Sequence, residues 1–331
     1  MGDRTGGERA EEARALFYTA PGAAAIRPVT LPPAAPGTVL VRTLFTGISR
    51  GTERLVFAGA VPESEHARMR APHQAGDFPF PVKYGYAAVG IAEDGPAEIR
   101  GRHVFALHPH QTRFRLPAGE VLPLPEDVPP ERAVLAANAE TALNAIWDAE
   151  LVSGARVLVL GAGLLGCLIA AFLSRLHDSV DVCDRLAERA AALSEFRVNF
   201  VSPDALGGDY ALVFHTTATA EGLALALDQA AFEGTVLELS WFGAGPVPVP
   251  LGGAFHSRRL TIRASQVGHV APARRATTSR RARLAEALAL LADPRLDALI
   301  TGEVAFDSLP AALPHLLAAD APGIATRIRY S

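Results

Sequence analysis

The chain has 331 residues, enough for about two domains of ~150 residues each. Its residues are 49% hydrophobic and 20% charged, which is too apolar for intrinsic disorder, and its net charge of -4 includes no basic block of the kind that binds nucleic acid. Two cysteines, Cys167 and Cys183, are too few for a disulfide framework or a four-cysteine zinc site.

No segment of the chain predicts export or membrane insertion. Residues 1–14 are polar and lack the apolar core of a signal peptide, which predicts a frayed tail in a cytoplasmic protein. Residues 157–174 form an uncharged apolar run of the length of a minimal membrane span, but three glycines near its start indicate a strand, a turn and a helix. We therefore expect neither a membrane nor a nucleic acid as a partner.

The first third of the chain predicts an irregular β domain. Residues 15–125 carry short apolar runs broken by Gly and Pro. After the proline-rich segment 122–130, residues 131–150 are alanine-rich with helical spacing of the larger apolar side chains. This spacing predicts a helical connector.

Strands and helices alternate from residue 156 onward. The predicted strands are 157–160, 180–183, 210–214 and 235–239, and the predicted helices are 164–176 and 187–196. Such alternation predicts a parallel sheet covered by helices on both faces. An amphipathic helix over 279–291 then precedes a short strand near 299–306 and a last helix and strand.

A glycine-rich turn joins the first of these strands to its helix. Gly161, Gly163 and Gly166 form a G-x-G-x-x-G pattern, with Leu164 and Leu165 at the start of the helix. Such a turn lets the backbone approach a pyrophosphate, and the N–H groups at the helix start are free to bind the anion. The pattern predicts dinucleotide binding, and the alternative is a tight turn without a ligand.

An acidic residue follows the second predicted strand. Asp184 lies 18 residues after Gly166, where a carboxylate would bind both hydroxyls of an adenosine ribose and repel a 2′-phosphate. This favours NAD(H) over NADP(H), although Arg185 and Arg189 beside it soften the discrimination.

These features together resemble the medium-chain dehydrogenase/reductase superfamily of zinc-type alcohol dehydrogenases. Residues 46–50 (TGISR) and 85–90 (GYAAVG) stand where zinc alcohol dehydrogenases have G-x-C and G-H-E-x-x-G, and residues 48–55 look most like the branch of the bacteriochlorophyllide dehydrogenases. The resemblance implies an α/β protein with a GroES-like domain (1–138 and 268–331) and a Rossmann domain (139–267), the latter a doubly wound parallel sheet.

The zinc ligands of that superfamily are replaced in this chain. The corresponding positions hold Ser49, Tyr86, Ala87 and Ala137. Because catalytic zinc needs about three protein ligands, we predict a zinc-free enzyme. His108 and His110, with His73 elsewhere, offer imidazoles, but no third ligand has recognisable spacing, and polar residues at a strand end are the simpler interpretation.

Without zinc, another group must stabilise a developing alkoxide and deliver a proton. Tyr86 stands at a former metal position, and Lys83 could lower its pKa or bind an anionic substrate. Glu53 could orient a donor, and His110 is a further candidate. The alternatives are a space-filling Tyr86, a solvated Lys83 and an exposed, salt-bridged Glu53.

The resemblance implies further site residues. Arg50 matches an arginine that neutralises the cofactor pyrophosphate, and Thr141 a threonine that contacts the nicotinamide face. Asn138 and Glu140 would then lie near the cleft unless they cap a helix. Ser240 follows a strand where backbone groups of the family meet the carboxamide, and the Arg-rich segment 274–283 fits a solvated loop.

The predicted function is a zinc-independent NAD(P)-dependent oxidoreductase. It would move hydride between the nicotinamide and a carbonyl or alcohol carbon of a small molecule, as a homodimer joined through the exposed edge of the Rossmann sheet. The alternatives are a quinone or enone reductase of the same fold and a non-catalytic NAD(P)-binding protein.

Overall fold

The computed structural model describes residues 12–331. Residues 1–11, which make up most of the expected tail, lie outside the described part, whereas residues 12–14 already belong to the first strand and are not frayed. Within residues 12–331, no helix is both long and apolar enough to cross a membrane.

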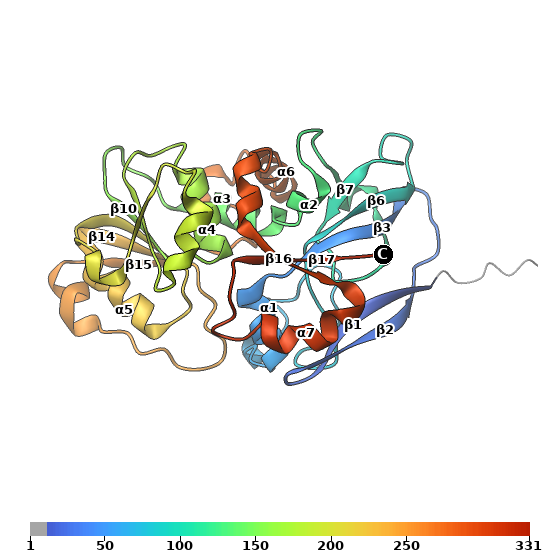
Figure 1. Cartoon of the computed structure of the whole chain (residues 1–331), viewed down its shortest axis with the longest axis horizontal. Coiled ribbons are helices and arrows are strands. Elements are labelled where there is room, and N and C mark those ends of the chain that lie inside the picture. The colour runs from blue at the N-terminus through green and yellow to red at the C-terminus, as the bar shows by residue number, and fades with distance from the viewer. Residues whose placement is uncertain (1–11) are drawn as a thin grey trace, which may run out of the picture.

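A six-stranded parallel sheet forms one half of the molecule (Figure 1). Its strands are β10 (Val157–Leu160), β11 (Val180–Cys183), β12 (Asn199–Val201), β13 (Tyr210–His215), β14 (Ala230–Glu238) and β15 (Thr261–Ala264). Their spatial order is β12-β11-β10-β13-β14-β15, and every neighbouring pair is parallel. This is the 3-2-1-4-5-6 order of a Rossmann fold, so the predicted fold class is confirmed.

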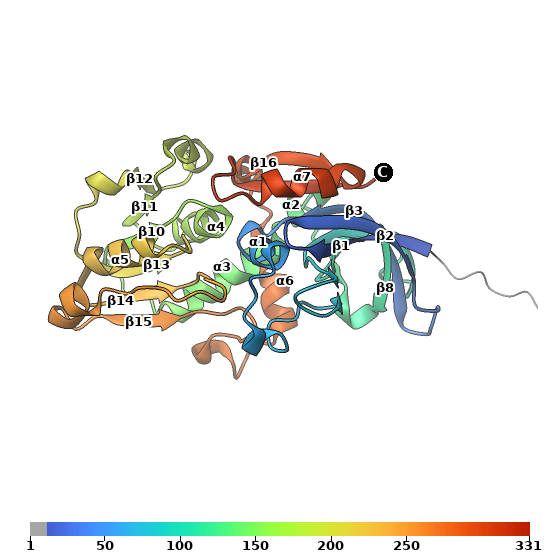
Figure 2. The ribbon, with the colours of Figure 1, turned by 90° about the horizontal axis from the view of Figure 1, so that it is seen from below.

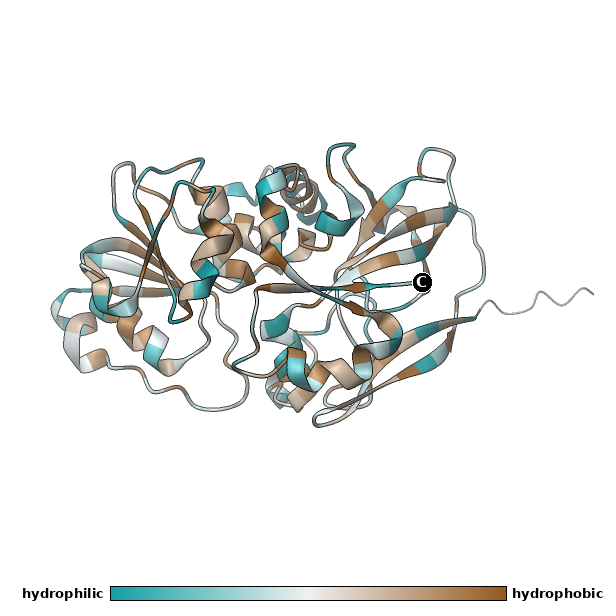
Figure 3. Cartoon of the chain, viewed as in Figure 1, coloured by the Kyte–Doolittle hydropathy of each residue, from teal (hydrophilic) through white to brown (hydrophobic). Residues whose placement is uncertain are grey.

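Helices cover both faces of this sheet. Val157 and Val159 of β10 are buried with residues of α3 (Ala136–Asp148) and α4 (Leu164–Leu173), whereas Leu158 and Leu160 are buried with residues of α5 (Ala220–Gln229). Burial on both faces explains why the central strand β10 is continuously apolar instead of alternating (Figure 3).

The other half contains two largely antiparallel sheets. The smaller has the order β2-β1-β5-β4, and the larger the order β16-β17-β3-β6-β7-β9, with β8 also paired to β3. The strands are β1 (Glu12–Ala20), β2 (Ala23–Thr30), β3 (Thr38–Gly47), β4 (Ala75–Gly76), β5 (Val82–Lys83), β6 (Ala88–Asp94), β7 (His103–Ala106), β8 (Arg113–Pro117), β9 (Leu122–Pro123), β16 (Ile300–Ala305) and β17 (Ala325–Arg329).

The C-terminal segment returns to complete this β domain. β17 pairs antiparallel with β3 and parallel with β16, so residues near both ends of the chain share one sheet. The remaining helices are α1 (Arg50–Ala58), α2 (Pro130–Ala133), α6 (Arg280–Leu290) and α7 (Leu309–Leu316). Figure 2 shows α3 and α6 between the two halves. The residue-level domain boundaries stay a prediction, because α3 runs across the first of them.

Two predicted helices differ in the structure. The connector expected over 131–150 is split into α2 and α3 by a turn at Val134 and Leu135, and the helix expected over 187–196 is a 3-10 helix over Ala187–Leu193. Propensity alone cannot set these details, because packing against the sheet selects the local geometry.

Candidate functional site

The glycine turn after β10 is tightly built at two of its three glycines. Gly161 has a φ of +106°, and a Cβ on Gly166 would lie 1.8 Å from the carbonyl oxygen of Gly161. By contrast, a Cβ on Gly163 would meet nothing within 4 Å. Gly163 is the N-cap of α4, and Leu164 and Leu165 open the helix. The first and third glycines therefore serve packing, and the second faces open space at a helix start that suits an anion.

Asp184 connects the end of β11 to this turn. Its Oδ2 accepts a hydrogen bond from the Ala162 N–H at 2.7 Å, and its Oδ1 accepts one from the Leu186 N–H at 2.9 Å. Arg189 pairs with the same carboxylate at 2.9 Å. Within the described residues, the buried Nε of Arg189 has no hydrogen-bond partner. Arg185, in contrast, is exposed.

Arg50 approaches the turn from the β domain. Its guanidinium donates to the carbonyl oxygens of Ala321 at 2.9 Å and Pro322 at 2.8 Å, in the loop before β17. Burial lowers the pKa of Arg50, and the positive charges of Arg189 and Arg54 lower it further. Two cations from different domains thus repel each other beside the glycine turn, and a bound anion would relieve that repulsion.

The hydroxyls of Thr141 and Ser240, two site residues implied by the resemblance, are hydrogen-bonded to backbone groups. The Thr141 hydroxyl donates to the Ala137 carbonyl at 3.1 Å within α3. The Ser240 hydroxyl accepts from the Ala218 N–H at 3.0 Å, which joins the loops that follow β13 and β14.

The positions of the expected metal ligands hold neutral hydroxyl and methyl groups. The Ser49 hydroxyl lies 3.4 Å from Oδ1 of Asn138. Burial raises the pKa of Tyr86 to about 12, hydrogen bonding with Ser49 and Thr52 opposes this rise, and the charge of Glu53 adds to it. This donor set lacks the thiolates, imidazoles and carboxylates that zinc prefers, so the residues do not fit the metal. Across residues 12–331, no cluster of three or more His, Cys, Asp and Glu side chains could hold a metal ion.

Glu53 and His110 form a buried pair beneath this site. Oε2 of Glu53 accepts from the Tyr18 hydroxyl at 2.6 Å and lies 2.9 Å from Nε2 of His110, while Oε1 accepts from the Ser49 N–H at 2.7 Å. His110 Nδ1 lies 2.7 Å from the hydroxyl of Thr46. Glu53 is fully buried, so the alternative of an exposed, salt-bridged Glu53 is wrong. Neither side chain reaches solvent; Glu53 holds the Ser49 backbone in place, and His110 holds Glu53.

Lys83 is hydrogen-bonded to a glutamine side chain. Its Nζ donates to Oε1 of Gln111 at 2.7 Å, and its charge lowers the pKa of His108. Burial lowers the pKa of Lys83 to about 8. Because β5 pairs with β1 and β4, the strand carries Lys83 into the smaller sheet. The effect of Lys83 on Tyr86 stays a prediction, and the charge that raises the pKa of Tyr86 in this structure is that of Glu53.

Two buried pairs of ionisable side chains were missed by sequence reasoning. Arg283 was expected in a solvated loop but is buried, and its Nε donates to Glu140 at 3.0 Å. Glu140 therefore joins α3 to α6. His215, at the end of β13, lies 2.7 Å from Glu238 of β14. Neither pair has a sequence signal, because the partners are 143 and 23 residues apart.

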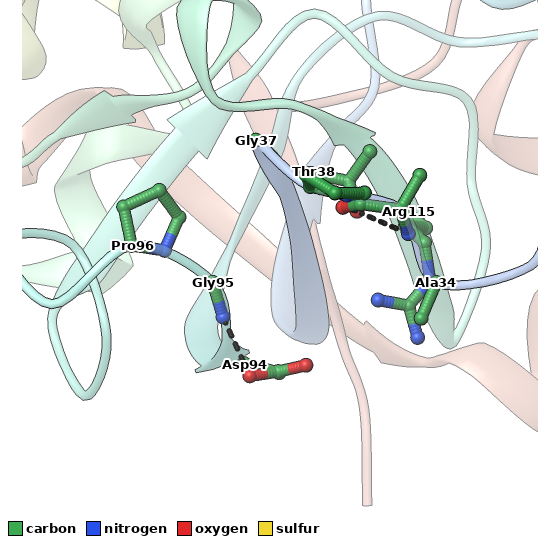
Figure 4. A pocket seen from close by; sticks show the side chains of 9 residues that line it. Ala34, Gly37, Thr38, Asp94, Gly95, Pro96 and Arg115 are labelled. Atoms are coloured by element: carbon green, nitrogen blue, oxygen red, sulfur yellow. Dashed lines mark hydrogen bonds between the residues drawn. The ribbon is translucent and has the colours of Figure 1, made fainter.

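Two cavities lie in different parts of the molecule, one beside the glycine turn and one on the β domain. A cavity of about 300 Å³ is lined by Arg189, Thr301 and Gly323, beside the cations described above. A larger one of about 460 Å³ opens on the β domain and contains none of the predicted site residues (Figure 4). It is lined by Ala34, Ala35, Pro36, Gly37, Thr38, Asp94, Gly95, Pro96 and Arg115.

No protein-family model matches the chain, and a search of curated proteins finds no match. Solved structures match over almost its whole length. L-idonate 5-dehydrogenase from Escherichia coli K-12 has a TM-score of 0.76 at 15% identity, covering 97% of this chain and 99% of that one. An alcohol dehydrogenase from Pyrobaculum aerophilum has a TM-score of 0.75 at 18% identity, with coverage of 96% and 100%.

A protein from Sinorhizobium meliloti 1021 that was solved bound to NADP also has a TM-score of 0.75 at 18% identity, with coverage of 96% and 99%. At sequence identities this low, the structural matches establish the fold alone. The chain has the same fold as these dehydrogenases, and the fold class expected from the sequence is confirmed.

Proposed function

We propose that the protein is a zinc-independent, NAD(P)-dependent oxidoreductase acting on a carbonyl or alcohol carbon of a small molecule. The observation that carries the proposal is the Tyr86 phenol at a position where the resemblance implies a metal ligand, with a pKa that burial raises to about 12 and that the Ser49 and Thr52 side chains lower. The glycine turn at α4 supports the cofactor, because its open middle glycine and free helix N–H groups suit a pyrophosphate. When bound, the nicotinamide would supply or accept the hydride.

Tyr86 would provide the proton. With a pKa of about 12 the phenol remains protonated near neutral pH, so it can donate a hydrogen bond to a substrate carbonyl oxygen. The Ser49 and Thr52 hydroxyls stabilise the phenolate left after transfer, whereas Glu53 disfavours it. These opposing effects hold the proton on Tyr86 until the substrate oxygen becomes basic. Glu53 and His110 act as positioning residues.

We propose that NAD(H) is favoured over NADP(H), because the Asp184 carboxylate follows β11 beside the glycine turn, where it would repel a 2′-phosphate. Arg189 supports the opposite preference, since its guanidinium lies against Asp184 and could receive a 2′-phosphate. We further propose a cytoplasmic homodimer joined through β15, one of the two edge strands of the parallel sheet.

The test compares two tyrosines that stand two residues apart. In a panel of ketones, enones and cyclic alcohols, Tyr86→Phe should lower turnover by ~10²-fold or more, a typical share for general acid catalysis, and leave NADH affinity unchanged. Tyr84→Phe, which also removes one buried hydroxyl, should retain turnover.

Other outcomes separate the alternatives. Unchanged turnover in Tyr86→Phe removes Tyr86 from the mechanism. NADH binding without turnover of any substrate favours a non-catalytic binding protein, and reduction of enones alone favours the quinone or enone reductase. One tightly bound zinc per purified chain would overturn zinc independence.

A further inference from the structure

A buried histidine and glutamate face each other at the carboxyl ends of β13 and β14. Nδ1 of His215 lies 2.7 Å from Oε2 of Glu238, and Nε2 of His215 lies 2.6 Å from the hydroxyl of Thr217. The His215 side chain is fully buried, and that of Glu238 is 13% exposed. An ionisable pair at this depth needs a reason beyond stability, because apolar side chains fill such positions without the cost of desolvation.

Glu238 connects two loops through its second oxygen. Oε1 of Glu238 accepts a hydrogen bond from the Ser240 N–H at 2.7 Å, and the Ser240 hydroxyl accepts one from the Ala218 N–H at 3.0 Å. The loop after β14 is thereby fixed to the loop after β13. His215 holds Glu238 in the rotamer that makes this possible.

Thr217, His215 and Glu238 have the hydrogen-bond order of a nucleophile, a base and an orienting acid. The packing of α5 leaves no room for a substrate there. A Cβ on Gly222 would lie 2.1 Å from the Thr217 hydroxyl and 2.7 Å from Nε2 of His215. The arrangement can therefore position backbone but cannot reach a reacting carbonyl.

The segment held by Glu238 lies between the two domains. Trp241 packs against the buried cluster of the β domain that contains Val56 of α1, whereas Phe242 packs on the parallel sheet and stacks with His215 at 6.2 Å. A Cβ on Gly243 would lie 2.9 Å from Cδ2 of Leu55. In Figures 1 and 2, α1 lies on the side of the β domain that faces the parallel sheet.

The strand order places this segment relative to a bound dinucleotide. The glycine turn follows β10, and Asp184 follows β11 on the adenosine side. In a doubly wound sheet the ligand crosses the point where the strand order reverses, so its other end lies over β13 and β14. We propose that His215 and Glu238 are positioning residues for the nicotinamide end of the cofactor. This inference rests on the proposed function.

Two ligands and three variants test it. Glu238→Leu removes the Ser240 and His215 hydrogen bonds, and the Kd for NADH should rise about tenfold, as expected for the loss of a hydrogen bond to a charged group. The Kd for ADP-ribose, which lacks the nicotinamide, should stay unchanged. Glu238→Gln should restore NADH affinity, because its amide can accept from Ser240 and donate to His215. Glu233→Leu, at an exposed position of the same strand, should change neither.

Several results would overturn the inference. An equal loss for both ligands indicates general destabilisation, and an unchanged Kd for NADH in Glu238→Leu removes the positioning role. If Glu238→Leu does not fold, Ser240→Ala takes its place, because it removes only the acceptor of the Ala218 N–H. This variant should weaken NADH several-fold without weakening ADP-ribose, and equal binding of NADH would contradict the inference.

A readout without ligand keeps the two proposals apart. If the unmodified protein binds neither ligand, the proposed function fails. Amide hydrogen exchange then tests the positioning role alone: residues 239–243 should exchange faster in Glu238→Leu but not in Glu238→Gln. Unchanged exchange in Glu238→Leu would refute it.

Discussion

The cofactor turn and the site at Tyr86 are built in different ways. In the parallel sheet, the turn depends on backbone geometry within six residues, where Gly161 and Gly166 are in direct contact. In the β domain, Ser49 is held by a network of buried side chains drawn from distant parts of the chain. A local site fails when one Cβ is added, whereas a nonlocal site fails when one buried partner is removed.

Removing Glu53 should have the largest effect on stability. Glu53→Ala leaves His110, the Tyr18 hydroxyl and the Ser49 N–H without their buried acceptor. We expect the free energy of unfolding to fall by about 3–5 kcal/mol, the usual range for breaking a buried pair. Urea denaturation measures this loss. Glu233→Ala breaks an exposed pair and should cost less than about 1 kcal/mol. Similar losses in the two variants would contradict the buried network.

Substitutions at two glycines of the turn should distinguish a loss of stability from a loss of cofactor affinity. Gly166→Ala places a Cβ against the Gly161 carbonyl, so it should lower the free energy of unfolding by about 1–3 kcal/mol or more, and NADH binding with it. Gly163→Ala has open space and should retain the melting temperature while weakening NADH. Thermal unfolding and NADH titration of both variants check this. Equal melting temperatures in the two variants would show that the turn is not packed as described.

Asp184 and Arg189 should set cofactor choice between them. Asp184→Ser removes the carboxylate and frees the guanidinium of Arg189, so the ratio of NADPH to NADH affinity should rise about tenfold, or ~1.4 kcal/mol. Titration with both cofactors measures the ratio. Arg189→Gln in the Asp184→Ser background should cancel the gain. A preference for NADPH in the unmodified protein would assign the dominant role to Arg189.

Lys83 should affect stability through pH. Burial lowers its pKa from 10.5 to about 8, so the folded state binds fewer protons than the unfolded state between these values. Stability should therefore rise with pH from about 8 to 10.5, and Lys83→Met should lack this increment. Urea denaturation of both proteins at pH 7 and pH 9.5 gives the difference. An identical pH dependence in both would place the Lys83 amine in solvent.

The sequence by itself determined the features that depend on neighbouring residues. The alternation of apolar strands and helices specified the parallel sheet, and the spacing of Gly161, Gly163 and Gly166 specified the turn. The loss of thiolates and imidazoles at Ser49 and Tyr86 was likewise visible, because residue type alone decides whether a side chain can bind zinc.

Only the tertiary structure decided which charged groups meet. Only two residues separate Lys83 from Tyr86, yet the Lys83 amine is hydrogen-bonded to Gln111. Arg283 looked solvated within an arginine-rich segment, but the packing of α6 on α3 buries it against Glu140. Partners far apart in sequence leave no periodic signal, and the charge of a buried group is tolerated only where the fold supplies its opposite.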